Sequence, residues 1–157
     1  MAPNTPDRPG VIAFPPLLYA ATLGVGLLLH YFVFPRQIIP LLPARILGAV
    51  LMVAGAGIAK WGEATMRRRG TNVDPRQPSL AIVAEGPFRV TRNPLYLGLI
   101  AIYCGVALAV DATVPFVLLP VLLAVTHYGI IRREERYLER KFGRSYLVYK
   151  ASVRRYL

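Results

Sequence analysis

The sequence predicts an all-α integral membrane protein with four transmembrane helices. Its 157 residues are 55% hydrophobic, and the apolar residues gather in four runs. These runs have about the length that a membrane-spanning helix needs, roughly 17–25 residues. The net charge is nevertheless +11, and most cations lie beside the apolar runs. Because soluble domains rarely combine these two properties, we expect residues 1–157 to form a single membrane domain.

The composition also limits the partners. The basic charge is expected to face anionic lipid headgroups, since no nucleic-acid-binding motif accompanies it. Cys104 is the only cysteine, so no intramolecular disulfide can form. Residues 1–10 predict a short disordered tail without the cleavage-site pattern of a signal peptide, and the first apolar run is expected to remain as an anchor.

The first two helices are predicted from apolar runs alone. Val11 to Phe34 is long enough to cross a bilayer, and Phe34-Pro35-Arg36 ends it. The second helix is predicted from Arg45 to about Met66, with Trp61 at the membrane interface. Small residues on one face of that helix favour the close approach of another helix: Gly48, Gly55, Ala59 and Gly62.

Residues 67–92 form a long polar connection, and several prolines favour an ordered, extended path for it. Gly86-Pro87 forces a turn, and Pro94 suits the first turn of a helix, where its missing N–H costs nothing. The helix from Leu95 is therefore expected to face this loop with its free N–H groups and its positive dipole end.

Two arginines add positive charge at the same place. Arg89 and Arg92 are expected to attract an anionic group such as a carboxylate. The alternative is that they only mark the cytoplasmic end of a transmembrane helix. Just before the loop, Glu63 and Arg67 are four residues apart, and this spacing predicts a solvated ion pair.

A helical hairpin completes the predicted membrane part. Leu95 to Val110 and Val114 to Ile131 are the third and fourth predicted spans, joined by a three-residue turn. The fourth helix is expected to continue as a cytoplasmic helical extension to about Phe142, where Gly143 ends it. The third span has its own stripe of small residues: Gly98, Ala101, Gly105 and Ala109.

Charge placement gives the expected orientation. With four crossings, both termini and the 67–92 connection share one side of the membrane, and this side carries most of the lysines and arginines. The positive-inside rule then places that side in the cytoplasm. We expect a multi-pass protein with both termini cytoplasmic, in the cell inner membrane if the chain is bacterial.

The charged helix that follows the fourth span carries Glu134 and Glu135. On an ideal α-helix, Glu134 and Leu138 lie on the same face as His127, which predicts that Glu134 faces the direction set by that membrane-embedded histidine. The alternative is that both glutamates pair with arginines of their own helix: Arg132, Arg133 and Arg136.

Two groups of residues together resemble the motifs of a known superfamily. The first is Gly86-Pro87-Phe88-Arg89 followed by Arg92-Asn93-Pro94-Leu95-Tyr96-Leu97-Gly98, and the second is Arg133-Glu134-Glu135 followed by Phe142-Gly143 and Tyr146. In this order, with a hairpin between them, they resemble the isoprenylcysteine carboxyl methyltransferase and phospholipid methyltransferase superfamily of membrane enzymes. The resemblance covers about residues 67–157, whereas the first two spans match only in hydropathy.

The resemblance implies methyl transfer from S-adenosylmethionine to a lipid or a lipidated acceptor. In this superfamily the first motif and a glutamate of the second build the cofactor pocket, and the loop before the Gly-Pro turn closes it. Carried onto this chain, the cofactor-binding residues would be Val83, Phe88, Asn93, Pro94, Leu95, Tyr96, Glu134 and Glu135. The motif usually has a histidine where this chain has Asn93, which can donate a hydrogen bond but cannot take up a proton near neutral pH.

The implied chemistry needs few catalytic groups. Methyl transfer from a sulfonium is an in-line displacement that requires alignment and the exclusion of water. We therefore name no general base, and the sequence shows no catalytic triad or metal-ligand cluster. Arg132 or Arg133 is expected to position an anionic acceptor. The acceptor, a carboxylate or an amine, and the oligomeric state stay open.

Two other functions are compatible with the sequence. The chain could be a non-catalytic membrane scaffold subunit that has retained the fold, which predicts no affinity for the cofactor. It could also be an anchor whose basic C-terminal segment binds anionic lipid. In that case the function would depend on the residues after Gly143 and would tolerate changes between Asn93 and Tyr96.

Overall fold

The computed structural model describes residues 7–33 and 41–156, and within these ranges the chain is helical, without a β-sheet. The expected end of the first span at Phe34-Pro35-Arg36 lies outside the described residues. The elements are α1 (Pro15–Phe32), α2 (Leu41–Arg68), the 3-10 turn η1 (Gly86–Arg89), α3 (Pro94–Ala109), α4 (Val114–Thr126), the π-helical turn η2 (His127–Ile131), α5 (Arg132–Phe142) and α6 (Arg144–Ser152).

Three helices are long and apolar enough to cross a membrane: α1, α2 and the continuous helix formed by α4, η2 and α5. The prediction of an all-α chain with helices of membrane-spanning length is therefore confirmed. The remaining apolar helix, α3, is shorter, with 16 residues. Because its length falls short of the usual crossing length, the fourth crossing stays a prediction.

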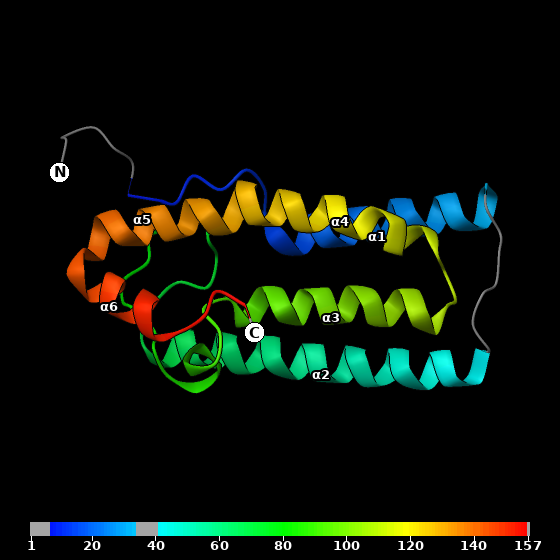
Figure 1. Ribbon diagram of the computed structural model, residues 1–157, viewed down its shortest axis with the longest axis horizontal. Helices are drawn as coiled ribbons and strands as arrows, with labels where there is room; N and C mark the ends of the chain where they lie inside the picture. Colours follow the sequence, from blue (N-terminus) through cyan, green and yellow to red (C-terminus); the bar gives the residue numbers. More distant parts are fainter. Residues whose placement is uncertain (1–6, 34–40, 157) are drawn as a thin grey trace.

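The long helices run side by side in two layers (Figure 1). In one layer α2 packs along α3, and in the other α1 packs against α4. The small-residue stripes meet between α2 and α3. A Cβ atom added at Gly55 would lie 2.6 Å from the carbonyl oxygen of Gly98, and one added at Gly105 would lie 2.7 Å from that of Gly48. The predicted close approach is thus confirmed, because the backbones touch where side chains are missing.

The polar parts of the chain gather at one end of the long helices (Figure 1). The 67–92 connection, α5 and α6 pack together there, while the turn between α3 and α4 lies at the other end. Residues 7–10, expected to belong to a disordered tail, also contact this end. Asp7 accepts hydrogen bonds from Tyr137 and Lys141, both at 2.7 Å, and Arg133 donates to the carbonyl oxygen of Gly10 at 2.9 Å.

Candidate active site

The loop that carries the first motif, residues 85–93 (the motif loop), is shaped by glycine and proline. Gly86 has φ +56°, and a Cβ atom there would lie 2.9 Å from the Thr65 hydroxyl of α2, so a side chain would be strained and crowded. The next residue, Pro87, is buried in the first part of the turn η1, and Pro94 stands at the start of α3. The sequence therefore predicts both ends of the motif loop correctly.

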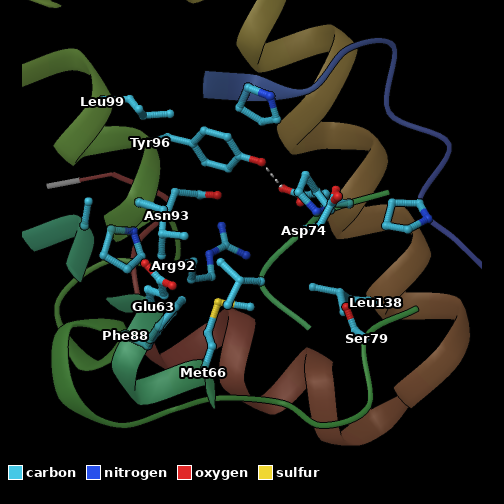
Figure 2. Close-up of a pocket in the computed structure, with 18 of the residues that line it drawn as sticks. Glu63, Met66, Asp74, Ser79, Phe88, Arg92, Asn93, Tyr96, Leu99 and Leu138 are labelled. Atoms are coloured by element: carbon cyan, nitrogen blue, oxygen red, sulfur yellow. Dashed lines mark hydrogen bonds between the residues drawn. The ribbon is translucent and has the colours of Figure 1, made fainter. Parts of the chain in front are cut away.

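A cavity of about 490 Å³ lies between the motif loop, the end of α2, the first turn of α3 and α5 (Figure 2). Its volume is within the range of small-molecule sites, roughly 300–1,000 Å³. Both predicted motifs contribute to its wall, although about 40 residues separate them in the sequence. The residues Phe14 to Pro16, before and at the start of α1, border the same cavity.

One hydrogen bond joins the two motifs across this cavity. The Tyr96 hydroxyl, from the first turn of α3, donates to Oε2 of Glu134 on α5 at 2.8 Å. Figure 2 shows this bond as the dashed line that begins at the labelled Tyr96. Tyr96 is buried, whereas Glu134 is half-buried and lines the open volume. The second carboxylate oxygen, Oε1, has no hydrogen-bond donor among the described residues, so Glu134 can still accept a hydrogen bond from a ligand.

Glu135 forms ion pairs with residues far away in the sequence. Arg155 donates to it through two atoms, Nε to Oε1 at 3.0 Å and Nη2 to Oε2 at 2.7 Å. Arg92 of the motif loop approaches the same carboxylate at 3.2 Å. In the described part of the chain, neither Glu134 nor Glu135 pairs with the arginines of its own helix. The alternative of local ion pairs is therefore wrong.

Arg92 is a buried cation, and only some of its hydrogen-bond donors have a partner. Its side chain is 8% exposed, and its Nε and Nη1 atoms have no hydrogen-bond partner among the described residues. Arg89, the other arginine of the motif loop, is exposed and does not line the cavity. A buried guanidinium with free donors favours an anionic ligand. Burial therefore distinguishes Arg92 from Arg89, although the sequence alone predicts the same role for both.

Asn93 lines the cavity but uses its amide group elsewhere. Its Nδ2 atom donates to the carbonyl oxygen of Arg155 at 2.9 Å, and the hydroxyl of Thr91 donates to the same oxygen at 3.1 Å. The segment after α6, residues 153–156, therefore lies directly against the motif loop. This contact could not be predicted from the sequence, because nothing in the local pattern of Arg154 and Arg155 distinguishes them from other cations.

Three groups at this end of the molecule that lie outside the membrane-spanning helices have pKa values that keep each of them in one charge state near neutral pH. Hydrogen bonds from Arg76 lower the pKa of Asp74, a carboxyl on the cavity wall. Burial raises the pKa of the Tyr149 hydroxyl to about 12, and this hydroxyl donates to the Phe88 carbonyl at 2.9 Å. The hydrogen bond to Glu135 raises the pKa of Arg155. None of these groups suits the transfer of protons near pH 7.

Most of the predicted pocket residues line the main cavity: Phe88, Asn93, Pro94, Leu95, Tyr96, Glu134 and Glu135. Val83 does not. It lines a smaller neighbouring space of about 90 Å³ and packs in a cluster with Phe88, Tyr146 and Tyr149. Gly98 packs against α2 instead of the cavity. Arg132 and Arg133, expected to position an acceptor, are exposed and do not line the cavity.

The helical-wheel prediction for α5 is only half right. Glu134 and Leu138 line the cavity together, but His127 does not, and its Nδ1 atom lies 2.6 Å from the Tyr156 hydroxyl. The π-helical turn η2 stands between His127 and Glu134 and breaks the period of 3.6 residues. Such a turn accommodates one additional residue, so the faces before and after it are no longer aligned.

The predicted ion pair on α2 is confirmed. Arg67 donates to Glu63 at 2.8 Å, and the two side chains are 70% and 43% exposed. Both residues also border the cavity, so the pair lies at its solvent-facing edge. At this exposure the pair contributes little to stability.

Comparison with known proteins finds a family model that matches the chain. A family model described as phospholipid methyltransferase matches residues 43–145, which is more than half of the chain. The matched region begins in α2 and ends at the start of α6, and it includes the motif loop and Glu134. No curated protein and no solved structure matches the chain.

Proposed function

The chain belongs to the phospholipid methyltransferase family, and we propose that it transfers a methyl group from S-adenosylmethionine to a lipophilic acceptor at the membrane. The observation that carries this proposal is the cavity in which both sequence motifs meet. Tyr96 and Glu134, one residue from each motif, are joined there by a hydrogen bond.

The residues of the cavity fit the chemistry of this cofactor. Arg92 has free, buried donors suited to a carboxylate, and Glu134 has a free carboxylate oxygen suited to ribose hydroxyls or to an ammonium group. The apolar side chains of Phe88, Leu95 and Leu99 supply surface for a flat, weakly polar ring. S-adenosylmethionine supplies the methyl group, which passes from its sulfonium sulfur to an oxygen or a nitrogen of the acceptor.

The chain's own contribution is alignment and exclusion of water. The cavity is held between α2, α3 and α5 and is lined mainly by apolar surface. A carboxylate acceptor needs no proton transfer, whereas an amine must lose a proton, and we assign no residue to that step. The apolar residues Phe14 to Pro16, before and at the start of α1, border the cavity. We propose that the lipid part of the acceptor enters beside them.

We further propose the orientation of the protein in the membrane. The polar end with the cavity faces the cytoplasm, where the soluble cofactor is available, and both ends of the chain lie on that side. This orientation requires α3 to cross as a fourth helix despite its 16 residues. Its close antiparallel packing along the longer α2 supports that crossing.

The experiment is a transfer assay with S-adenosylmethionine labelled in its methyl group and the purified protein in lipid nanodiscs. Phosphatidylethanolamine is offered as an amine acceptor and N-acetyl-S-farnesylcysteine as a carboxylate acceptor. We expect label in one of the two lipids. Alkali distinguishes the products, since it releases the label from a methyl ester but not from a methylated amine.

Matched variants separate catalysis from folding in this assay. Glu134→Gln is expected to reduce transfer strongly, because it replaces one carboxyl oxygen on the cavity wall with an amide nitrogen, which cannot accept a hydrogen bond. Glu139→Gln lies on the same helix outside the cavity, paired with Lys150, and is expected to keep activity. If the folded protein neither binds the cofactor nor labels a total lipid extract, the non-catalytic scaffold becomes the better account.

A further inference from the structure

We propose that residues 153–156 are a clamp that holds the motif loop, and that Asn93 is a positioning residue which serves this clamp. The inference rests on the proposed function, since the clamped loop is the one assigned to the cofactor. The clamp lies beyond residues 43–145 that match the family model.

Hydrogen bonds to two backbone carbonyl groups of residues 153–156 form the first part of the clamp. The N–H of Arg92 donates to the carbonyl oxygen of Arg154 at 2.9 Å, and Thr91 and Arg154 form a β-bridge. The carbonyl oxygen of Arg155 accepts from both Thr91 and Asn93, at 3.1 and 2.9 Å. Three consecutive residues of the motif loop are thus bonded to two consecutive carbonyl groups, immediately before Pro94 starts α3.

The side chains of Arg155 and Tyr156 form the second part of the clamp, through contacts with α5 and η2. The guanidinium of Arg155 binds both carboxylate oxygens of Glu135, at 3.0 and 2.7 Å, and Glu135 is 6% exposed. The Tyr156 hydroxyl lies 2.6 Å from Nδ1 of His127. The clamp therefore joins the motif loop to the helix that carries Glu134. These are the two sides of the cavity that a cofactor must contact together.

Arg155 also determines whether the hydrogen-bond donors of Arg92 stay unpaired. Because Arg155 binds Glu135 through two hydrogen bonds, Glu135 makes only one longer contact, of 3.2 Å, with Arg92. The remaining donors of Arg92 stay unpaired beside the cavity. Without Arg155, Arg92 would be the one remaining ion-pair partner of Glu135 among the described residues and would be drawn toward it. The clamp thereby keeps Arg92 available for an anionic ligand.

The contact of Asn93 explains which side chains this position can accept. The amide donates to a carbonyl oxygen, so the position requires a hydrogen-bond donor. The N–H of a histidine ring can also donate, whereas a carboxylate would place an oxygen against the Arg155 carbonyl. Position 93 therefore acts in this chain as a donor to the clamp and not as a carrier of protons.

The test compares two pairs of variants of the full-length protein in detergent. Asn93→Asp has nearly the shape of asparagine but lacks the donor, and Asn93→His restores one. Arg155→Met removes the guanidinium, and Arg154→Met is its control, because the Arg154 side chain is exposed and only its backbone is used. Each variant is titrated with S-adenosylhomocysteine, and amide hydrogen exchange is followed at residues 91–93 and 153–156.

We expect Asn93→Asp and Arg155→Met to weaken S-adenosylhomocysteine binding about tenfold or more and to accelerate exchange in both segments. Asn93→His and Arg154→Met should stay within about threefold of the wild-type affinity, with wild-type exchange. Equal losses for Asn93→Asp and Asn93→His would mean that the asparagine amide itself contacts the cofactor. That result, or unchanged exchange in Arg155→Met, overturns the clamp.

The two readouts separate this inference from the proposed function. If the wild type does not bind S-adenosylhomocysteine, the cofactor assignment fails, and the part of the inference that concerns cofactor binding fails with it. Hydrogen exchange would still show whether the clamp exists. If the wild type binds and all four variants bind equally well, the proposed function stands and the clamp is wrong.

Discussion

Tyr96 and Tyr103 place two buried hydroxyls on the same helix, with different partners. The Tyr96 hydroxyl donates to Glu134 at the cavity, and the Tyr103 hydroxyl donates to the Pro115 carbonyl in the core, both at 2.8 Å. Tyr103→Phe removes a buried hydrogen bond and should lower stability by about 1 kcal/mol without changing S-adenosylhomocysteine affinity. Tyr96→Phe should weaken binding several-fold with a smaller loss of stability.

Thermal unfolding and calorimetric titration of both variants check this difference. Because the two substitutions remove the same atom from the same helix, general effects of losing a hydroxyl cancel in the comparison. If Tyr96→Phe changes only the melting temperature, the contact with Glu134 is structural and the cavity loses its main polar feature.

Arg92 and Arg89 provide a second comparison at the residue scale. Arg92 is buried with free donors beside the cavity, whereas Arg89 is exposed. Arg92→Gln should weaken S-adenosylhomocysteine binding about tenfold or more, since a charge-assisted hydrogen bond is worth roughly 1.5–3 kcal/mol. Arg89→Gln should bind like the wild type.

An analogue without the carboxylate identifies the group that Arg92 binds. Decarboxylated S-adenosylhomocysteine should bind Arg92→Gln as well as it binds the wild type, since the contact is missing in both cases. An equal loss with the complete ligand and with the analogue would contradict the carboxylate assignment. It would then point to a structural role for Arg92 beside Glu135.

At the scale of helices, the α2–α3 interface predicts a sharp contrast between two glycines of α2. A Cβ atom at Gly55 would lie 2.6 Å from the Gly98 carbonyl oxygen, whereas one at Gly57 meets nothing within 4 Å. Gly55→Ala should therefore destabilise the protein by about 1–3 kcal/mol through forced separation of the helices. Gly57→Ala should be neutral or stabilising by up to about 1 kcal/mol, because alanine favours helix.

Melting temperatures in one detergent measure both variants. Equal melting temperatures for Gly55→Ala and Gly57→Ala would show that α2 and α3 are not in backbone contact at this position.

The sequence predicts individual helices better than the relations between them. The stripe with Gly55 and the start of α3 at Pro94 follow from local patterns, since small residues and prolines act on their own segment. The turn η2 was not predicted, because a π-helical turn has no strong local signal. As a consequence, the prediction from an ideal α-helix placed His127 on the same face as Glu134. In the structure the two residues do not share a face.

At the scale of the whole molecule, four crossings predict alternating exposure of three positions. Arg89, Val110 and Arg140 are exposed and are separated by α3 and by the helix that begins with α4. In a Cys104→Ser background, single cysteines at 89 and 140 should react with an impermeant maleimide only after permeabilisation, and one at 110 should react in intact cells. If positions 89 and 110 label from the same side, α3 does not cross.

The path of the whole chain explains why the sequence predicts only part of the site. Phe88, Tyr96 and Glu134 belong to motifs that resemble known ones, and the structure brings them to one cavity. The contact of Arg155 with Glu135 depends on how the chain returns after α6. One arginine among many cations gives no sign of that path. Contacts between segments that are distant in the sequence could therefore be identified only from the structure.

Binding of the cofactor tests the central claim most directly. The measurement is calorimetric titration of S-adenosylhomocysteine into the wild-type protein in detergent and in nanodiscs, with Glu134→Gln and Glu139→Gln alongside. The account predicts saturable binding with one site per chain, weakened by the change at Glu134 and unaffected by the change at Glu139. A well-folded wild type that binds nothing in either environment would contradict it.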